Sequence, residues 1–183
     1  MSSQSRNKGN NMRLLFEMDK KDYEKCTRVL VRNSARSIII HNRKIAMIHS
    51  LEYDYYKFPG GGIEEGEDAV EAMIRETREE SGLVVIPETV LEYGYVHRIQ
   101  KSDKDNDECF IQDNFYYLCE ATTQVLSQEL NAYEAKERYT LEYIEPEKAI
   151  KKNRMVGQNP YDGIMFEREA KVLELLLTEG YFM

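Results

Sequence analysis

The sequence of 183 residues contains no tryptophan, only three histidines and only three cysteines. The cysteines, Cys26, Cys109 and Cys119, are odd in number and lack the spacing of metal-ligand pairs, so we expect reduced thiols. No run approaches 18 uncharged apolar residues, and residues 1–11 lack the apolar segment of a secretory signal. These absences predict a cytoplasmic protein without a membrane span.

The sequence also has fewer basic than acidic residues. Lysine and arginine number 25 against 33 acidic residues, which gives a formal net charge of -8. Such a balance argues against binding nucleic acid through its phosphates, and we expect no sequence-specific nucleic-acid partner. An anionic small molecule would need a local cation or a metal ion.

The length predicts one domain with a buried core. We expect residues 1–11, which are polar and rich in Ser and Asn, to be a disordered tail, and residues 12–183 to form a single domain. Alternating and helical patterns predict strands at 12–18, 26–33, 35–42, 45–51, 53–58, 83–86, 90–99, 110–122 and 138–144, and helices at 68–81, 145–150 and about 162–178. Helices interspersed with strands favour an α/β fold whose sheet is covered on both faces.

The helix at 68–81 carries an unusual concentration of acidic residues. Glu76, Glu79 and Glu80 share one face, beside Arg75 and just after the three glycines at 60–62. A solvated acidic surface would explain the glutamates alone. The glycines, however, allow the backbone to approach a ligand closely, and carboxylates are the ligands that Mg²⁺ prefers. The pattern therefore favours a divalent-metal site.

The same residues resemble a known sequence motif. Gly61, Glu67 and the run Arg75–Leu83 (RETREESGL) have the spacing of the Nudix box, G-x5-E-x7-R-E-U-x-E-E-x-G-U. One position departs, because Thr77 stands where the motif has a bulky aliphatic residue, and we expect that change to affect packing rather than metal binding. The resemblance implies the α/β/α Nudix sandwich, with a mixed β-sheet between helices. It also implies hydrolysis of a nucleoside diphosphate linked to another group X.

Roles for the box residues follow from this resemblance. It implies that Glu76, Glu79 and Glu80 ligate Mg²⁺ or Mn²⁺, with Glu79 also counted among the catalytic residues. Arg75 would orient these carboxylates through an ion pair. Gly61 would let the loop turn and would place its carbonyl near the metal.

The identity of the general base stays open. Many Nudix enzymes draw it from a glutamate in the loop before the last strand, where this chain has Glu134 and Glu137. We favour Glu137 because it directly precedes the strand at 138–144. A metal-bound water acting alone is the third alternative.

Four further residues are candidates for substrate contact. Tyr56 belongs to an aromatic cluster that either stacks on a base or sugar or packs against the sheet. Lys57 and Arg98 are candidate phosphate contacts, and Glu67 is a lesser acidic contributor.

The alternative function is a Nudix-fold domain that binds or senses a nucleotide or nucleotide sugar without cleaving it. In either case the expected partner is a small nucleoside diphosphate derivative. The sequence leaves open the identity of X, the number of metal ions and whether the protein forms a homodimer.

Overall fold

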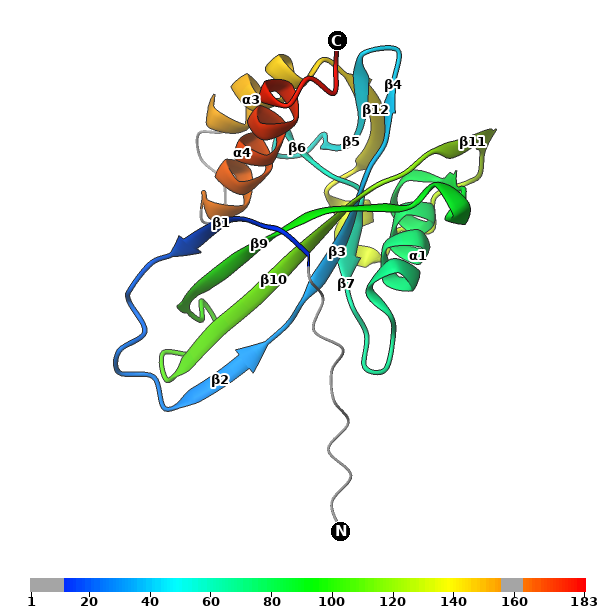
Figure 1. The fold of residues 1–183 in the computed structure, drawn as a ribbon. Helices are drawn as coiled ribbons and strands as arrows, with labels where there is room; N and C mark the ends of the chain where they lie inside the picture. Colours follow the sequence, from blue (N-terminus) through cyan, green and yellow to red (C-terminus); the bar gives the residue numbers. More distant parts are fainter. Residues whose placement is uncertain (1–11, 156–162) are drawn as a thin grey trace.

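The computed structural model describes residues 12–155 and 163–183, so the tail expected at 1–11 lies outside the described residues. Figure 1 shows the arrangement of the secondary structure along the chain. The strands are β1 (Leu14–Asp19), β2 (Arg28–Val31), β3 (Ser34–Ile38), β4 (Ile40–His41), β5 (Lys44–Ser50), β6 (Tyr55–Lys57), β7 (Gly60–Gly62), β8 (Leu83–Val85), β9 (Leu91–Lys101), β10 (Glu108–Leu118), β11 (Ala121–Val125) and β12 (Tyr139–Ile144). The helices are α1 (Ala69–Ser81), α2 (Ala132–Lys136), α3 (Pro146–Met155) and α4 (Ile164–Thr178), with a 3₁₀ turn at Pro87–Thr89.

The largest sheet is mixed. Its strands lie in the order β1-β9-β10-β3-β7, and β2 also pairs with β10. β10 is antiparallel to β9 and parallel to both β2 and β3, while β7 is antiparallel to β3. A second sheet has the order β12-β5-β4 with β6 paired to β5, and β8 pairs with β11.

Helices cover the sheets from two sides, with α1 on one side and α3 and α4 together on the other (Figure 1). Side chains that alternate along the strands build two separate cores. Ile38 and Tyr116 pack with Val172 and Leu173 of α4, whereas their neighbours Ala35, Ile39 and Tyr117 pack with Ala72 and Met73 of α1. This two-sided burial confirms the predicted α/β/α sandwich with a mixed sheet between helices.

A tight turn joins the antiparallel strands β4 and β5. The turn between β4 and β5 contains Asn42 and Arg43, both with positive φ, at 50° and 64°. Two such residues in succession suit the tight turns that follow the twist of antiparallel strands. β4 and β5 therefore form an antiparallel hairpin.

Several boundaries differ from prediction. The strand expected at 110–122 divides into β10 and β11, and the short helix α2 was not predicted at all. Helix α3 continues to Met155 instead of ending at Ile150. Its polar second half is held by Asn153, whose side-chain amide bonds both the N–H and the carbonyl of Tyr56 at 2.8 Å. A tertiary contact of this kind leaves no periodic signal in the sequence.

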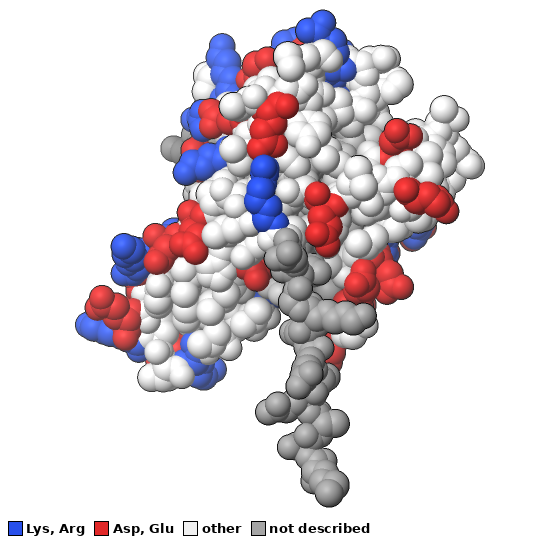
Figure 2. All heavy atoms as spheres, viewed as in Figure 1, with Lys and Arg blue, Asp and Glu red and all other residues white. Residues whose placement is uncertain are grey.

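Charged side chains are dispersed over the face in Figure 2, and no continuous basic area lies there. None of the helices in residues 12–155 and 163–183 has the length and apolar character needed to cross a bilayer. The three cysteines are free thiols, as expected.

A buried ionic cluster joins α4 to the segment before the glycines. Glu169 is fully buried and accepts hydrogen bonds from Arg168 Nε at 2.9 Å and from the backbone N–H of Phe58 at 2.7 Å. Arg36 Nε lies 3.9 Å from the same carboxylate. Attraction to these cations lowers the pKa of Glu169 against the opposing effect of burial, so it is ionised at neutral pH. The cluster thus fixes the chain at Phe58 against the last helix.

Removing this charge should be costly. We expect Glu169→Gln to lower the free energy of unfolding by about 3–5 kcal/mol, because Arg168 would remain buried without a counter-charge. Denaturant unfolding would measure the change. Glu167→Gln, on the same helix but in an exposed pair with Arg154, is the matched control and should cost about 1 kcal/mol or less. Equal losses in the two variants would contradict this account of the cluster.

Candidate active site

One pocket, of about 600 Å³, gathers most of the predicted site residues. Its walls come from α1, from the glycine strand β7 and from the start of α2. Its floor is one face of β2, β3, β9 and β10, to which every second residue of each strand contributes a side chain. The predicted residues in its lining are Lys57, Gly61, Arg75, Glu76, Glu79, Glu80, Arg98 and Glu134.

Helix α1 begins and ends at well-defined caps. Asp68 accepts a hydrogen bond from the backbone N–H of Val70, and Glu71 completes a capping box. Gly82 ends the helix with φ of 76°, a conformation that favours glycine. Thr77 is fully buried and donates to Ser37 Oγ at 2.9 Å. The departure at Thr77 therefore concerns packing, as expected.

Arg75 organises the more exposed carboxylates. Its guanidinium donates to both oxygens of Glu67, at 2.7 and 2.9 Å, to Glu76 Oε1 at 2.7 Å and to Glu79 Oε2 at 3.3 Å. It also donates to the carbonyl of Gly62 at 3.3 Å. Hydrogen bonding to Arg75 lowers the pKa of Glu67 to about 2. Arg75 therefore ties the box helix to the glycine strand and contacts Glu76 and Glu79 at the same time.

Glu80 is the buried member of the acidic group. Its side chain is 2% exposed and accepts from Lys57 Nζ and from the backbone N–H of Gly60, the latter at 3.1 Å. Burial raises the pKa of Glu80, and attraction to Lys57 opposes that shift. Lys57 also donates to the carbonyl of Gly60 at 3.4 Å and lies 5.0 Å from the centre of the Tyr139 ring.

Gly61 is required for close contact with Glu76. A Cβ at position 61 would lie 2.3 Å from Glu76 Oε2, whereas a Cβ at Gly62 would meet nothing nearer than the Arg32 guanidinium at 3.7 Å. The glycine thus lets a carboxylate lie directly against the strand.

The two glycines make a matched pair for mutation. Because the end of a side chain can move, we expect Gly61→Ala to displace the Glu76 carboxylate with a loss of stability below about 1 kcal/mol. Titration calorimetry with Mn²⁺ should show affinity reduced by about tenfold or more, an effect typical of disturbing the positioning of a metal ligand. Gly62→Ala should leave Mn²⁺ affinity close to that of the parent. Unchanged affinity in Gly61→Ala would exclude Glu76 as a ligand in the stated position.

No three His, Cys, Asp or Glu side chains converge as a preformed metal centre anywhere in the part of the chain that the structure describes. The expected cage is therefore not preformed, because Lys57 and Arg75 occupy the box carboxylates. The donor set nevertheless fits Mg²⁺ or Mn²⁺. Glu76 and Glu79 are partly exposed at the pocket wall, backbone carbonyls lie beside them, and no histidine or cysteine lines the pocket. Mg²⁺ commonly takes one or two carboxylates and keeps several waters.

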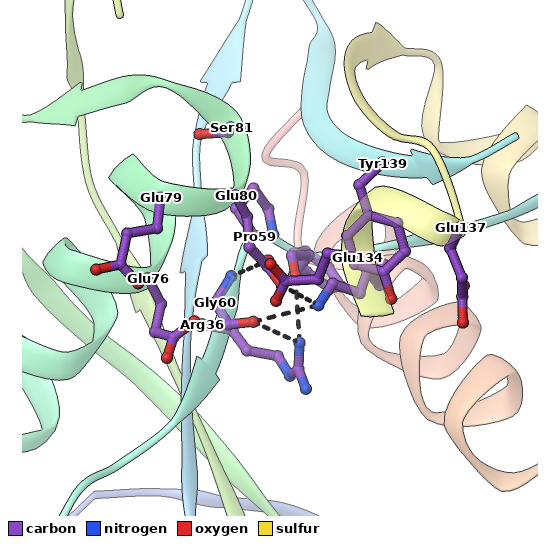
Figure 3. Close-up of polar contacts among 12 residues, drawn as sticks. Arg36, Pro59, Gly60, Glu76, Glu79, Glu80, Ser81, Glu134, Glu137 and Tyr139 are labelled. Atoms are coloured by element: carbon purple, nitrogen blue, oxygen red, sulfur yellow. Dashed lines mark hydrogen bonds and ion pairs between the residues drawn. The ribbon is translucent and has the colours of Figure 1, made fainter. Parts of the chain in front are cut away.

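Figure 3 distinguishes the two candidate bases. Glu134 extends from α2 toward Gly60 and Glu80, and it lines the pocket. Glu137 points away from them, with its carboxylate accepting from Ser50 Oγ at 3.0 Å and Tyr55 Oη at 2.7 Å. Glu134 lies within α2 and Glu137 at its C-terminal end, so the two side chains point in different directions. The preference for Glu137 is thus not supported by the geometry, which favours Glu134.

Two of the four candidate substrate contacts lie at the pocket and two do not line it. Lys57 and Arg98 line the pocket, while Glu67 stands behind Arg75 as its counter-ion. Tyr56 faces a different hollow, stacks on His49 with ring centres 4.3 Å apart and donates to Glu142 at 2.8 Å. Of the two alternatives for Tyr56, packing within the protein therefore fits the structure and stacking on a substrate base or sugar does not.

Sequence reasoning missed Arg36 and Arg32, which both line the pocket. Arg36 is 7% exposed and donates to the carbonyls of Phe58 and Gly60 at 3.2 and 3.4 Å. The available signal was an arginine inside an otherwise small and apolar strand segment, ARSIII. Arg32 gave no such signal, since a lone arginine before a turn is ordinary.

Fold and pocket together define the class of α/β/α proteins in which an acidic helix and a glycine strand form the wall of one site. A family model for the NUDIX domain matches residues 23–161. The chain belongs to the Nudix family.

Known structures share the fold at low sequence identity. A NUDIX hydrolase from Nitrosomonas europaea superimposes with a TM-score of 0.55 at 14% identity, covering 78% of this chain and 88% of that one. MutT, from work on the Aliivibrio salmonicida and Vibrio cholerae proteins, gives 0.52 at 16% identity, covering 82% and 99%.

A curated relative matches over a shorter stretch. The U8 snoRNA-decapping enzyme of Homalodisca vitripennis is 32% identical over 69 residues. This match spans 37% of the present chain and 37% of that enzyme.

Proposed function

We propose that the protein is a Mg²⁺- or Mn²⁺-dependent hydrolase that cleaves the pyrophosphate bond of a nucleoside diphosphate linked to another group X. The observation that carries the proposal is one open pocket whose lining includes Glu76 against Gly61, Glu80 against Gly60, and Glu79 from the same helix. Membership of the Nudix family supports a hydrolase, as does the short match to a decapping enzyme.

The chain's own residues would bind and orient the reacting groups. When bound, the divalent cation supplies charge neutralisation at the phosphates and lowers the pKa of a coordinated water. Glu76 and Glu79 would hold it at the pocket wall, with Arg75 fixing their orientation, and Glu80 would join them once it separates from Lys57. Lys57 would then be released to face an anionic substrate.

Glu134 is placed to handle the proton. Water attacking phosphorus forms a new P–O bond, the bridging P–O bond breaks, and the water must lose a proton to an acceptor. Glu134 lines the same pocket as the box acids, and one of its oxygens is anchored by the backbone N–H of Asn131 at 2.9 Å. We assign it the role of general base, which contributes typically 10²- to 10⁴-fold.

One observation favours the non-catalytic alternative, namely that Lys57 and Arg75 pair with the carboxylates and leave no preformed cage in the described residues. A hydrolysis screen separates the two functions. Nucleoside triphosphates, dinucleoside polyphosphates, ADP-ribose and nucleotide sugars would be incubated with the purified protein and Mg²⁺ or Mn²⁺. Binding without turnover of any of them would favour the sensing domain.

Metal dependence and the box acids are tested together. We expect turnover only with Mg²⁺ or Mn²⁺ and none in excess EDTA, and we expect Glu79→Gln and Glu80→Gln to lower turnover by about 10²-fold or more. Stability should separate the two variants. Glu79→Gln should fold as the parent does, whereas Glu80→Gln leaves Lys57 buried without a counter-charge and should cost about 3–5 kcal/mol. Full activity of Glu79→Gln with normal metal affinity would show that the acidic face of α1 is only a solvated surface.

The general base is tested by a second pair. We expect Glu134→Gln to lower turnover at neutral pH by about 10²-fold or more, with part of the loss recovered as hydroxide becomes available at higher pH. Glutamine keeps the acceptor that caps α2, so folding should be preserved. Glu137→Gln should change melting temperature but leave turnover within a few fold. Equal pH–rate profiles for both variants and the parent would assign the role to metal-bound water alone.

A further inference from the structure

The pocket floor carries a regular grid of side chains. β2 and β3 both pair in parallel with β10 at a constant offset of 80 residues, from Arg28 of β2 beside Glu108 to Ser34 of β3 beside Asn114. β9 pairs with the other edge of β10, so residues at matching positions form rows across three strands. Every second residue faces the same side, and successive rows lie about 7 Å apart.

Three rows lead outward from the glycine strand. The first is Ser34–Asn114–Val96, and β7 adjoins it where Gly62 pairs with Ser34. The next is Arg32–Gln112–Arg98, and the last is Leu30–Phe110–Gln100. All members of the last two rows line the pocket.

The middle row is cationic and polar. The Arg32 side chain is exposed beside Gly62 and makes no hydrogen bond or ion pair with any residue in 12–155 or 163–183. Gln112 likewise has no side-chain partner within those ranges. Across the row, Arg98 is held in place by Gln100 Oε1, which accepts from its Nε at 3.0 Å and its Nη2 at 2.7 Å. The row thus presents two guanidiniums about 7 Å beyond the box glycines.

The outer row offers an apolar and planar surface. The Arg98 guanidinium lies 5.4 Å from the centre of the Phe110 ring, and Leu30 beside it is 40% exposed. Aromatic rings and arginine planes are the usual partners of a stacked nucleobase. This surface lies about 13 Å from the glycine strand, two rows out.

We propose that the preferred substrate is a nucleoside polyphosphate of three or more phosphates. Its chain crosses the Arg32–Gln112–Arg98 row, and its base stacks on the Arg98–Phe110 pair. This inference rests on the proposed function and specifies its substrate class. With the base on the outer row, the phosphates between the base and the bond cleaved at the box lie over the arginine row, where two guanidiniums match their charge. A polyphosphate cleaved toward its far end keeps two or more phosphates over that row, whereas ADP-ribose or a nucleotide sugar, cleaved at its single pyrophosphate bond, keeps only the phosphate attached to its nucleoside.

Arg32 is the specificity-determining residue to change. ATP, diadenosine tetraphosphate and ADP-ribose share one base and differ in the number of phosphates that can lie between that base and the scissile bond. We expect the parent to have a higher kcat/KM for ATP or the tetraphosphate than for ADP-ribose. Arg32→Gln should lower kcat/KM for the polyphosphates about tenfold or more, mostly through KM, and for ADP-ribose by a smaller factor, because only one phosphate lies over the arginine row.

Two controls keep this comparison specific. Lys101→Gln removes the same charge from β9 on the opposite face of the sheet and should change neither substrate. Phe110→Leu should weaken both, because both carry the base. Calorimetric binding of a methylene-bridged ATP analogue that resists hydrolysis gives a readout independent of turnover, and Arg32→Gln should weaken it about tenfold.

The outcomes separate this inference from the proposed function. Preference for ADP-ribose, or an equal effect of Arg32→Gln on all three substrates, overturns the polyphosphate assignment while hydrolase activity stands. Absence of hydrolysis by the parent overturns the proposed function, and the binding measurement then decides the inference. Weaker analogue binding by Arg32→Gln supports the polyphosphate site, whereas no binding, or equal binding by parent and variant, overturns it.

Discussion

The carboxylate of Glu80 lies in the protein interior, where an isolated charge is costly, and Lys57 and the N–H of Gly60 hold it there. These contacts join the box helix α1 to the end of β6 and the start of β7. Arg75 makes a second connection to the carbonyl of Gly62. The wall of the pocket is therefore built by polar contacts between a helix and a strand without side chains. Every other residue of the site takes its position relative to that wall.

This arrangement divides the pocket by charge. The acidic end lies at α1 and β7, while two arginines lie on the strands about 7 Å away. At the acidic end Glu76 and Glu79 pair with Arg75 and Glu80 pairs with Lys57, whereas Arg32 at the other end has no partner among the described residues. The phosphate chain of the proposed substrate would bridge both ends, with a divalent cation neutralising its charge at the acidic end. The net charge of -8 is thus compatible with an anionic ligand.

Much of the fold was predictable from sequence, and the reasons are local. The apolar runs in and next to β3 and in β5 mark strands buried on both faces, and the capped helix α1 repeats its apolar residues at helical spacing. The box spacing likewise placed Glu76, Glu79 and Glu80 together at one helix face. What escaped prediction depends on contacts distant in sequence. Glu134 and Glu137 differ because Glu134 lies within α2 and faces the pocket, while Glu137 follows at the end of α2 and is held elsewhere by Tyr55 and Ser50. Arg32 and Arg98, 66 positions apart in sequence, lie in one row on either side of Gln112, which no local pattern reveals.

The buried Glu169 also affects when the site is completed during synthesis. Its carboxylate accepts from the N–H of Phe58, directly before Pro59 and the glycines, and it does so from the last helix of the chain. A ribosome releases α1 and β7 roughly a hundred residues before α4, so during that interval the glycine segment has no anchor on this side. With synthesis at about 5–20 residues per second, the interval lasts several seconds. The nascent chain therefore carries every box residue before α4 can hold Phe58, and the segment leading to the pocket wall lacks this contact until α4 has been made.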